Sequence, residues 1–334
     1  MALLRRTSSL LTGLLLLGAA AEAQTLRMAL EGGGPILGLG SLSRAEEIHV
    51  NEGGSWYTLV TANVLTRPDE TPRDGGVLRN GFVTIREGAT LASPAMATVV
   101  GIDDFDATPR GDIAMALSLE GVPIPGQDDA GLYLNSVPLL SRGRPVEIEG
   151  YGPTTLWRDF LDVVATPDGN LLVLVSLDDP DVGGPSNRGM VRVFLDENGE
   201  LVGKELVMKD SQQLANVPRP IRSVGTGPHA FDGDAHGNVL VRLFQSGGQA
   251  ADGLVAYNET QLARENTFSI IPDRRYNDLS TSRVDLNNRD ELVFTATLQG
   301  DGTTNELILR GRALSREEVE LEIFVQKGDT LPSL

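Results

Sequence analysis

Short apolar runs alternate with polar turns along most of the chain. One unit recurs five times: a turn rich in Asp, Asn or Gly, an apolar strand, a variable loop, and a second strand that usually opens with Gly. The apolar runs are residues 56–60, 113–117, 171–175, 239–243 and 292–296. Gly and Asn tolerate positive φ, and Asp side chains bond their own backbone, so such turns close tight reversals between strands. The pattern therefore predicts repeated antiparallel sheets.

The turns recur at a regular interval. From Gly54, successive turns follow after 57, 58, 68 and 53 residues, the last at Asp290. The second strands open at Gly76, Gly131, Gly189 and Gly253, and near Asn305. Units of three or four strands that repeat every ~40–60 residues are typical of a β-propeller. A string of β-sandwich domains is the alternative, but it needs about 90–100 residues per unit.

We therefore expect an all-β fold, a β-propeller of about five blades in a single domain over residues 24–334. The apolar runs are almost continuous, as expected of strands that are buried on both faces. An additional strand and turn in residues 25–38 can complete the last blade. Residues 324–332 supply a closing strand and turn of their own, so a partial sixth blade remains an alternative. Residues 196–199 predict a hairpin turn.

Two segments resemble known propeller repeats. Residues 327–332, Lys-Gly-Asp-Thr-Leu-Pro, look like repeats of large bacterial secreted β-propeller-like proteins, most of them of unknown function and some with a C-terminal sorting anchor. Residues 163–173 are similar to an NHL-type propeller strand. Both resemblances imply a propeller, and neither carries a catalytic residue set to this chain. The sequence departs from those proteins in showing no sorting tail, so surface anchoring is not part of what we expect from the resemblance.

The first 23 residues have the pattern of a signal peptide. Arg5 and Arg6 precede an apolar run at residues 10–17, and residues 21–23, Ala-Glu-Ala, form a small-x-small cleavage site. The apolar run is shorter than the ~20 residues that a membrane-spanning helix needs. We therefore expect export, cleavage after Ala23, and a periplasmic or secreted product without a transmembrane span.

Composition narrows the partners and the chemistry. The chain has 28 Lys and Arg against 46 Asp and Glu, so a phosphate backbone would repel it and nucleic acid is not an expected partner. It has no Cys and three His, which excludes disulfides and thiolate metal sites. The sequence also lacks a nucleophile elbow, a His-Glu-x-x-His motif, a phosphate loop and a dinucleotide fingerprint. Nothing in it fixes the oligomeric state.

Three acidic segments are candidates for binding a cation, with calcium the expected ion. Residues 232–238 match the beginning of a calcium loop, Asp-x-Asp with Gly at the sixth position, although Leu243 stands at the twelfth position, where a Glu is needed. A polar turn without a cation is the alternative for residues 232–238. The other two segments, residues 103–106 and 178–181, are expected in loops, and a solvated loop without a cation is their alternative. The candidate ligands are Asp232, Asp234, His236, Asp103, Asp104, Asp106, Asp178, Asp179 and Asp181.

Histidine adds one further possibility at the same turn. His229 and His236 stand seven residues apart, and with Asp232 or Asp234 they would form a metal site or a general base pair. His49 precedes the first unit, and we expect it to be an ordinary strand residue.

These observations favour an exported, non-catalytic propeller that binds a protein, a glycan or an envelope component, because propellers present loops around an axial mouth. The alternative is a cation-dependent hydrolase or lyase that uses loop carboxylates near the propeller axis to act on sugar polymers or lactones. The two hypotheses differ in geometry, since the enzyme needs its acidic side chains to converge on one place.

Overall fold

The computed structural model describes residues 34–329 apart from 37, 52–53, 64–72, 95, 180–186, 215, 228, 248–251 and 301. These residues form 22 strands and no α-helix, so this part of the chain contains no helix of the kind that crosses a membrane. The strands are β1 (Pro35–Ile36), β2 (Gly40–Val50), β3 (Trp56–Asn63), β4 (Gly75–Arg79), β5 (Phe82–Arg86), β6 (Thr98–Ala107), β7 (Ile113–Glu120), β8 (Ala130–Leu134), β9 (Val137–Ser141), β10 (Leu156–Ala165), β11 (Leu171–Asp178), β12 (Arg188–Leu195), β13 (Leu201–Lys209), β14 (Ile221–Val224), β15 (Phe231–Gly233), β16 (Val239–Gln245), β17 (Gly253–Tyr257), β18 (Thr260–Arg264), β19 (Val284–Leu286), β20 (Glu291–Thr297), β21 (Glu306–Ala313) and β22 (Val319–Gln326).

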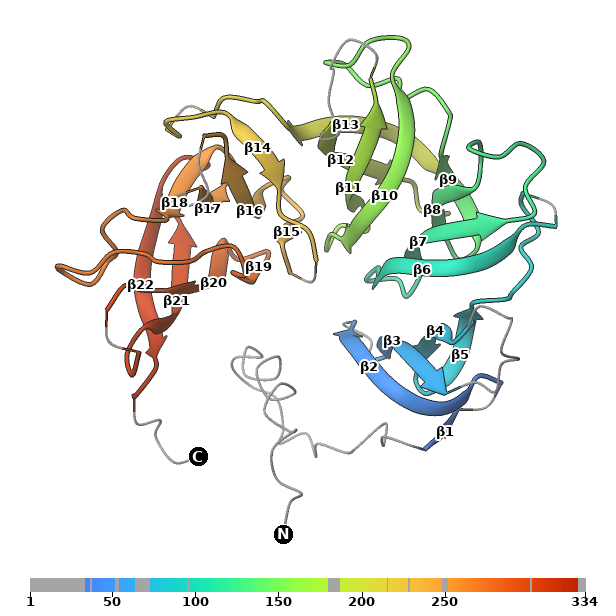
Figure 1. Ribbon diagram of the computed structural model, residues 1–334, viewed down its shortest axis with the longest axis horizontal. Coiled ribbons are helices and arrows are strands. Elements are labelled where there is room, and N and C mark those ends of the chain that lie inside the picture. Colours follow the sequence, from blue (N-terminus) through green and yellow to red (C-terminus); the bar gives the residue numbers. More distant parts are fainter. Residues whose placement is uncertain are drawn as a thin grey trace.

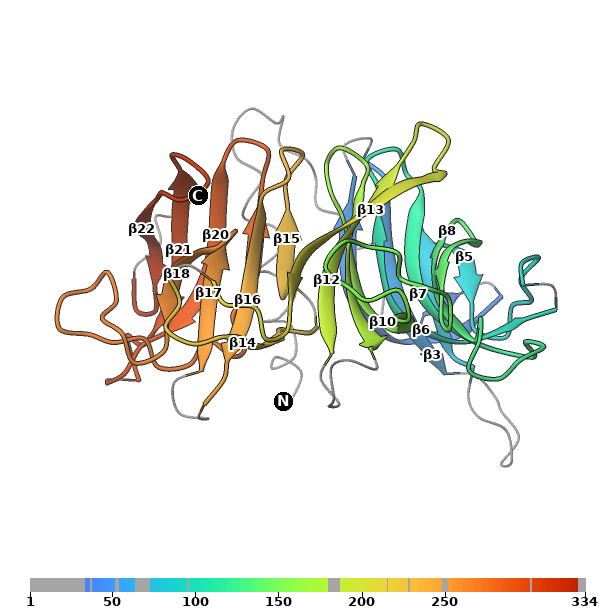
Figure 2. The same ribbon diagram turned by 90° about the horizontal axis from the view of Figure 1, so that it is seen from above.

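The strands form five antiparallel sheets that stand around a common axis as the blades of a β-propeller (Figure 1). Blade one contains β1–β5, blade two β6–β9, blade three β10–β13, blade four β14–β18 and blade five β19–β22. In blade four, β14 and β15 both pair with β16, so the inner strand of this blade is split into two pieces. After the 90° turn of Figure 2, the strands of all blades are roughly aligned with one axis, with neighbouring strands running in opposite directions. The all-β, five-bladed fold expected from the sequence is confirmed.

Each predicted apolar run lies in the strand that pairs with the inner strand of its blade and follows it in the sequence, namely β3, β7, β11, β16 or β20, which we call the second strand. The hairpin predicted at residues 196–199 joins β12 to β13, and the Asp196 carboxylate accepts N–H bonds from Asn198 and Glu200 within it. The inner strands β2, β6, β10, β15 and β19 precede the turns and were not part of the predicted unit. The expected loop at residues 103–106 is therefore wrong, since these residues lie in β6, where Phe105 is buried.

The second strands of the middle blades pack on both faces. In β11, Leu171, Val173 and Val175 belong to the apolar cluster between blades two and three. Leu172 and Leu174 of the same strand point the other way, into the cluster between blades three and four. Because successive side chains of a strand alternate between its faces, a continuous apolar run is what this double burial requires.

Blade five differs from the middle blades. Leu292, Phe294 and Ala296 of β20 are buried against blade four, whereas the alternate residues of this strand are only half-buried. Four apolar clusters fill the four seams between consecutive blades, and a small fifth cluster covers the outer face of blade one. Within the described residues, no apolar cluster lies on the outer face of blade five. This outer face carries Glu291, Arg310 and Arg312 beside the half-buried Val293 and Ile308, so its charged residues occupy one part of it.

Some predictions concern residues outside the described part of the chain. They are the signal peptide in residues 1–23, most of the additional strand in residues 25–38, Asp181, and the end of the C-terminal repeat copy. These remain predictions.

Candidate functional site

The same polar turn follows the inner strand of every blade. Its first residue donates its backbone N–H to the carbonyl oxygen four residues later, at N–O distances of 2.8–3.1 Å. The turn-opening residues are Asn51, Thr108, Thr166, Asp234 and Asn287. Counting back two residues from each gives equivalent positions on the inner strands. They are occupied by His49, Asp106, Val164, Asp232 and Asp285, which we call the axial ring.

Carboxylates on the inner strands link neighbouring blades. Asp106 Oδ2 accepts the backbone N–H of Ala165 at 2.8 Å, and Asp232 Oδ2 accepts that of Leu286 at 2.7 Å. In both cases the acceptor belongs to one blade, and the donor is one residue past the axial-ring position of the next blade. Asp104 Oδ2 makes the corresponding bond one pleat lower, to the N–H of Val163 at 2.6 Å. We call these three carboxylates the inter-blade clasps.

Blade one joins the ring through a histidine. His49 Nδ1 lies 2.7 Å from Asp106 Oδ1, and the His49 ring makes an edge-to-face contact with Phe105 at 4.9 Å between centroids. Asp106 is only 8% exposed and also accepts the N–H of Ala107. A single buried carboxylate thus ties the inner strands of blades one, two and three together. His49 is therefore more than the ordinary strand residue expected.

Asp232 and Asp285 form a pair of hydrogen-bonded carboxyl groups between blades four and five. Burial raises the pKa of Asp232 well above its ordinary value, and the neighbouring Asp285 and then Asp106 add to this, although the Leu286 and Gly233 N–H groups oppose it. Asp285 is exposed as a residue, but the protein around its carboxyl group desolvates that group and raises its pKa, against the effect of His229. Two negative charges at this distance repel each other, so the Asp232–Asp285 pair holds a proton more readily than isolated carboxyl groups do.

The remaining candidate ligands lie in separate places. Asp234 is 1% exposed and accepts the N–H groups of His236 and Asn238, so it stabilises the turn as the polar-turn alternative requires. Asp103 is exposed and accepts the Ser118 hydroxyl. Asp178 ends β11 and Asp179 follows it. Across the described residues, no three His, Asp or Glu side chains are grouped as a metal ion requires. Calcium binding stays a prediction.

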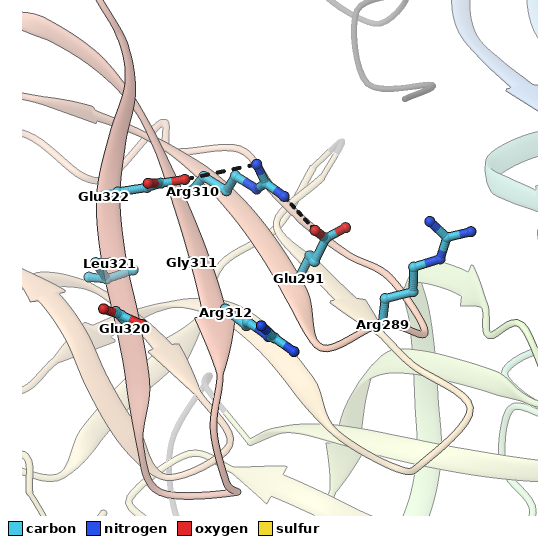
Figure 3. A pocket seen from close by; sticks show the side chains of 8 residues that line it. All are labelled: Arg289, Glu291, Arg310, Gly311, Arg312, Glu320, Leu321 and Glu322. Atoms are coloured by element: carbon cyan, nitrogen blue, oxygen red, sulfur yellow. Dashed lines mark hydrogen bonds and ion pairs between the residues drawn. The ribbon is translucent and has the colours of Figure 1, made fainter. Parts of the chain in front are cut away.

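A charged groove of about 550 Å³ lies on the outer face of blade five (Figure 3). It is lined by Arg289, Glu291, Arg310, Gly311, Arg312, Glu320, Leu321 and Glu322. The charged residues come from β20, β21, β22 and the turn before β20, and antiparallel pairing brings them side by side. Gly311 lies at the base of the groove, and a Cβ there would lie 2.8 Å from side-chain atoms of both Leu292 and Leu321, on the side of the sheet that packs against blade four.

Only part of the charge in this groove is neutralised internally. Arg310 Nη2 lies 2.5 Å from Glu291 Oε1, and Arg310 Nη1 lies 3.9 Å from Glu322 Oε1. Figure 3 shows Arg310 between these two carboxylates, while Arg289 and Arg312 extend away from the strands. Among the described residues, no carboxylate lies within the 4.0 Å ion-pair distance of Arg289 or Arg312.

The sequence contained a signal for the axial ring but none for the groove. His49, Asp106, Asp232 and Asp285 share one spacing to the turn that follows them, and this repeat of titratable residues is visible without coordinates. The groove residues, in contrast, have the alternation of any solvated strand face. Only the blade order shows that no further blade covers them in the described structure.

No protein-family model matches the chain, and no curated protein matches it either. Three solved structures are similar over most of this chain. The polysaccharide lyase Uly1 is 11% identical, with 81% of this chain and 58% of that chain covered and a TM-score of 0.35. A puromycin hydrolase is 9% identical, with coverages of 87% and 55% and a TM-score of 0.32.

The third structure is PorZ, described as an essential bacterial surface component of the type-IX secretion system of Porphyromonas gingivalis. It is 11% identical, with 87% of this chain and 42% of that chain covered and a TM-score of 0.34. The chain spans about half the length of these three proteins. At such identities and TM-scores the likeness indicates nothing about function. The resemblance to secreted bacterial propeller repeats remains a prediction.

Proposed function

We propose that this protein is an exported, non-catalytic binding module that uses the outer face of blade five to hold a protein, a glycan or an envelope component. The observation that carries the proposal is the polar face of this blade. The second strands of blades two, three and four are almost entirely buried, whereas β20 alternates between buried and half-buried residues. A groove lined by charged residues on a sheet face is suited to binding a partner with complementary charges.

The hydrogen bonds of the inner carboxylates support a structural role for them. Asp104, Asp106 and Asp232 each accept a backbone N–H from the next blade. Buried polar groups in folded proteins are normally satisfied in this way, and loss of such a bond leaves an unpaired amide inside the protein.

A second candidate function rests on the Asp232–Asp285 pair. One protonated and one ionised carboxyl group side by side is an arrangement used in acid–base hydrolysis. A hydrolase or lyase of this kind would lose its activity in an Asp285→Asn variant. Assays on acidic sugar polymers and lactones, with calcium and with a chelator, test this alternative and the role of the cation together.

Co-sedimentation with bacterial envelope preparations tests the binding proposal. We expect the wild-type protein to sediment with envelopes, and Arg289→Glu combined with Arg312→Glu to reduce the bound fraction severalfold. Arg283→Glu combined with Arg316→Glu, an equal charge change on two exposed residues outside the groove, is the matched control. No sedimentation of the wild type would contradict the function, whereas equal sedimentation of all three proteins would place binding elsewhere on the surface.

Export is tested independently. We propose that residues 1–23 are removed during secretion, so the protein recovered from the periplasm or medium of an expressing bacterium should begin at Gln24. A product that keeps Met1 and stays inside the cell would contradict the exported location and leave the groove unaffected.

A further inference from the structure

We propose that the groove of blade five binds a protein partner through a segment in which acidic and basic side chains alternate. This inference rests on the proposed binding function and names the chemistry of the partner. It starts from the charge pattern of the sheet face, which the strand register fixes.

Opposite charges face one another across the strands. Arg312 pairs in register with Glu291 of β20 on one side and with Glu320 of β22 on the other. In the next row, Arg310 pairs with Glu322. Together with Arg289, the groove therefore contains three arginines and three glutamates. A ligand of a single sign would meet like charges somewhere on this face, at a cost in free energy.

Both signs remain available to a ligand. Arg310 is held by Glu291 and Glu322, but within the described structure Arg289, Arg312 and Glu320 have no ion-pair partner. All three are exposed. A carboxylate beside Arg312 and an ammonium group beside Glu320 would complete both. These two residues lie on neighbouring strands about 5 Å apart. In an extended ligand only every second side chain faces the sheet, so the complementary charges belong on residues i and i+2 of the ligand.

The lining also separates a peptide from other polymers. Apart from Gly311 and Leu321, the residues that line the groove are charged, and Leu321 packs against the apolar cluster between blades four and five. No aromatic residue lines the groove. A sugar ring therefore has no flat face to stack on, whereas a protein segment needs only salt bridges and backbone contacts here. A polyanion would in addition be repelled by the chain's net charge of −18. An extended segment that carries Glu and Lys in turn at every second position presents both signs on one face and satisfies each of these conditions.

Fluorescence anisotropy with labelled synthetic peptides at low salt tests the proposal. The probes are a peptide with Glu and Lys in turn at every second position and Ser between them (the alternating peptide), an all-Glu peptide, an all-Lys peptide and an oligogalacturonate. We expect the alternating peptide to bind most tightly, and added salt to weaken it because the contacts are ionic. Tightest binding of the all-Glu peptide or of the oligogalacturonate would overturn the inference.

Variants sharpen the result. Arg312→Glu and Glu320→Lys should each weaken binding of the alternating peptide by about five- to tenfold. Glu320→Lys is decisive, because a plain anion site would bind more tightly after this change. Arg312→Glu combined with Glu320→Arg should restore most of the binding, since both signs are present again in exchanged places. Arg316→Glu should have no effect. The variants change exposed residues, so circular dichroism and melting temperature serve as folding controls.

The outcomes also distinguish this inference from the proposed function. Wild-type protein that sediments with envelopes but binds no peptide would overturn the mixed-charge partner and leave the binding function intact. Concentration-dependent dimerisation of the wild type that is abolished by Arg312→Glu would show that a second copy of the chain occupies the groove, which would also overturn the inference.

Discussion

At the scale of single residues, burial changes the chemistry of several carboxyl groups. Asp210 is 9% exposed and accepts the backbone N–H of Arg188. Burial raises its pKa to about 6, even though this hydrogen bond, the charge of Arg188 and the Val224 N–H act in the opposite direction. A carboxyl whose pKa is raised by folding takes up a proton when the chain folds, so its contribution to stability is greatest below its unfolded pKa.

This gives a pH-dependent prediction for Asp210. As the pH rises from about 4 to about 6, the group should lower the unfolding free energy of the wild type by roughly 2 kcal/mol, and by little more above that range. Asp210→Asn lacks this titration, so its stability relative to wild type should improve by that amount across the interval. Urea denaturation of both proteins at the two ends of the interval measures the difference. A constant difference would contradict the raised pKa.

The Asp232–Asp285 pair makes a related prediction with a matched comparison. Both pKa values are raised, so the pair stabilises the fold in acid and loses this contribution as the pH rises and the shared proton leaves. Asp285→Asn removes one charge and keeps a hydrogen-bonding group, so it should raise the melting temperature at pH 8 and have little effect at pH 4. A lower melting temperature at pH 8 would show that the second charge is stabilising instead.

At the scale of elements, the sequence revealed the apolar second strands and missed the inner strands. The runs in β7, β11 and β16 are continuous because neighbouring blades cover both of their faces. The inner strands are short or polar: β15 and β19 have three residues each, and β6 contains Asp103, Asp104 and Asp106. Their carboxylates resemble those of a solvated loop until the neighbouring blade supplies the N–H groups.

Loss of a clasp should therefore cost more than loss of a solvated acid on the same strand. Asp104→Ala leaves the Val163 N–H without its 2.6 Å bond, and we expect it to reduce the unfolding free energy by about 1–3 kcal/mol. Asp103→Ala removes an exposed carboxylate from the neighbouring position of the same strand. It should change the unfolding free energy by less than about 0.5 kcal/mol. Equal effects of the two substitutions in chemical denaturation would contradict the clasp.

At the scale of the whole molecule, the described residues form five blades around one axis, and four apolar seams join consecutive blades from blade one to blade five. Each blade needs a neighbour to cover its apolar face, so the two ends of the row require separate solutions. Blade one covers its outer face with a small cluster that includes Leu42, Val60 and Leu78. Blade five instead carries charges there, which lets the face remain in water and makes it available to a partner.

The sequence alone could not identify this charged end as a site. Glu291, Arg310, Arg312 and Glu320 stand on three different strands, and each of those strands shows an ordinary alternation of polar and apolar residues. Their significance comes from the order of the sheets, which places these strands in the last blade. The order depends on contacts between distant segments and not on local pattern.

Arginine modification followed by mass spectrometry tests the uncovered face most directly. With phenylglyoxal, Arg289 and Arg312 of the native full-length chain should react quickly, while Arg242, which is 7% exposed between blades, should react only after unfolding. The alternating Glu–Lys peptide should slow the reaction of Arg312. Native protein in which Arg312 is protected as strongly as Arg242, with no ligand present, would mean that this face is covered and would contradict the account.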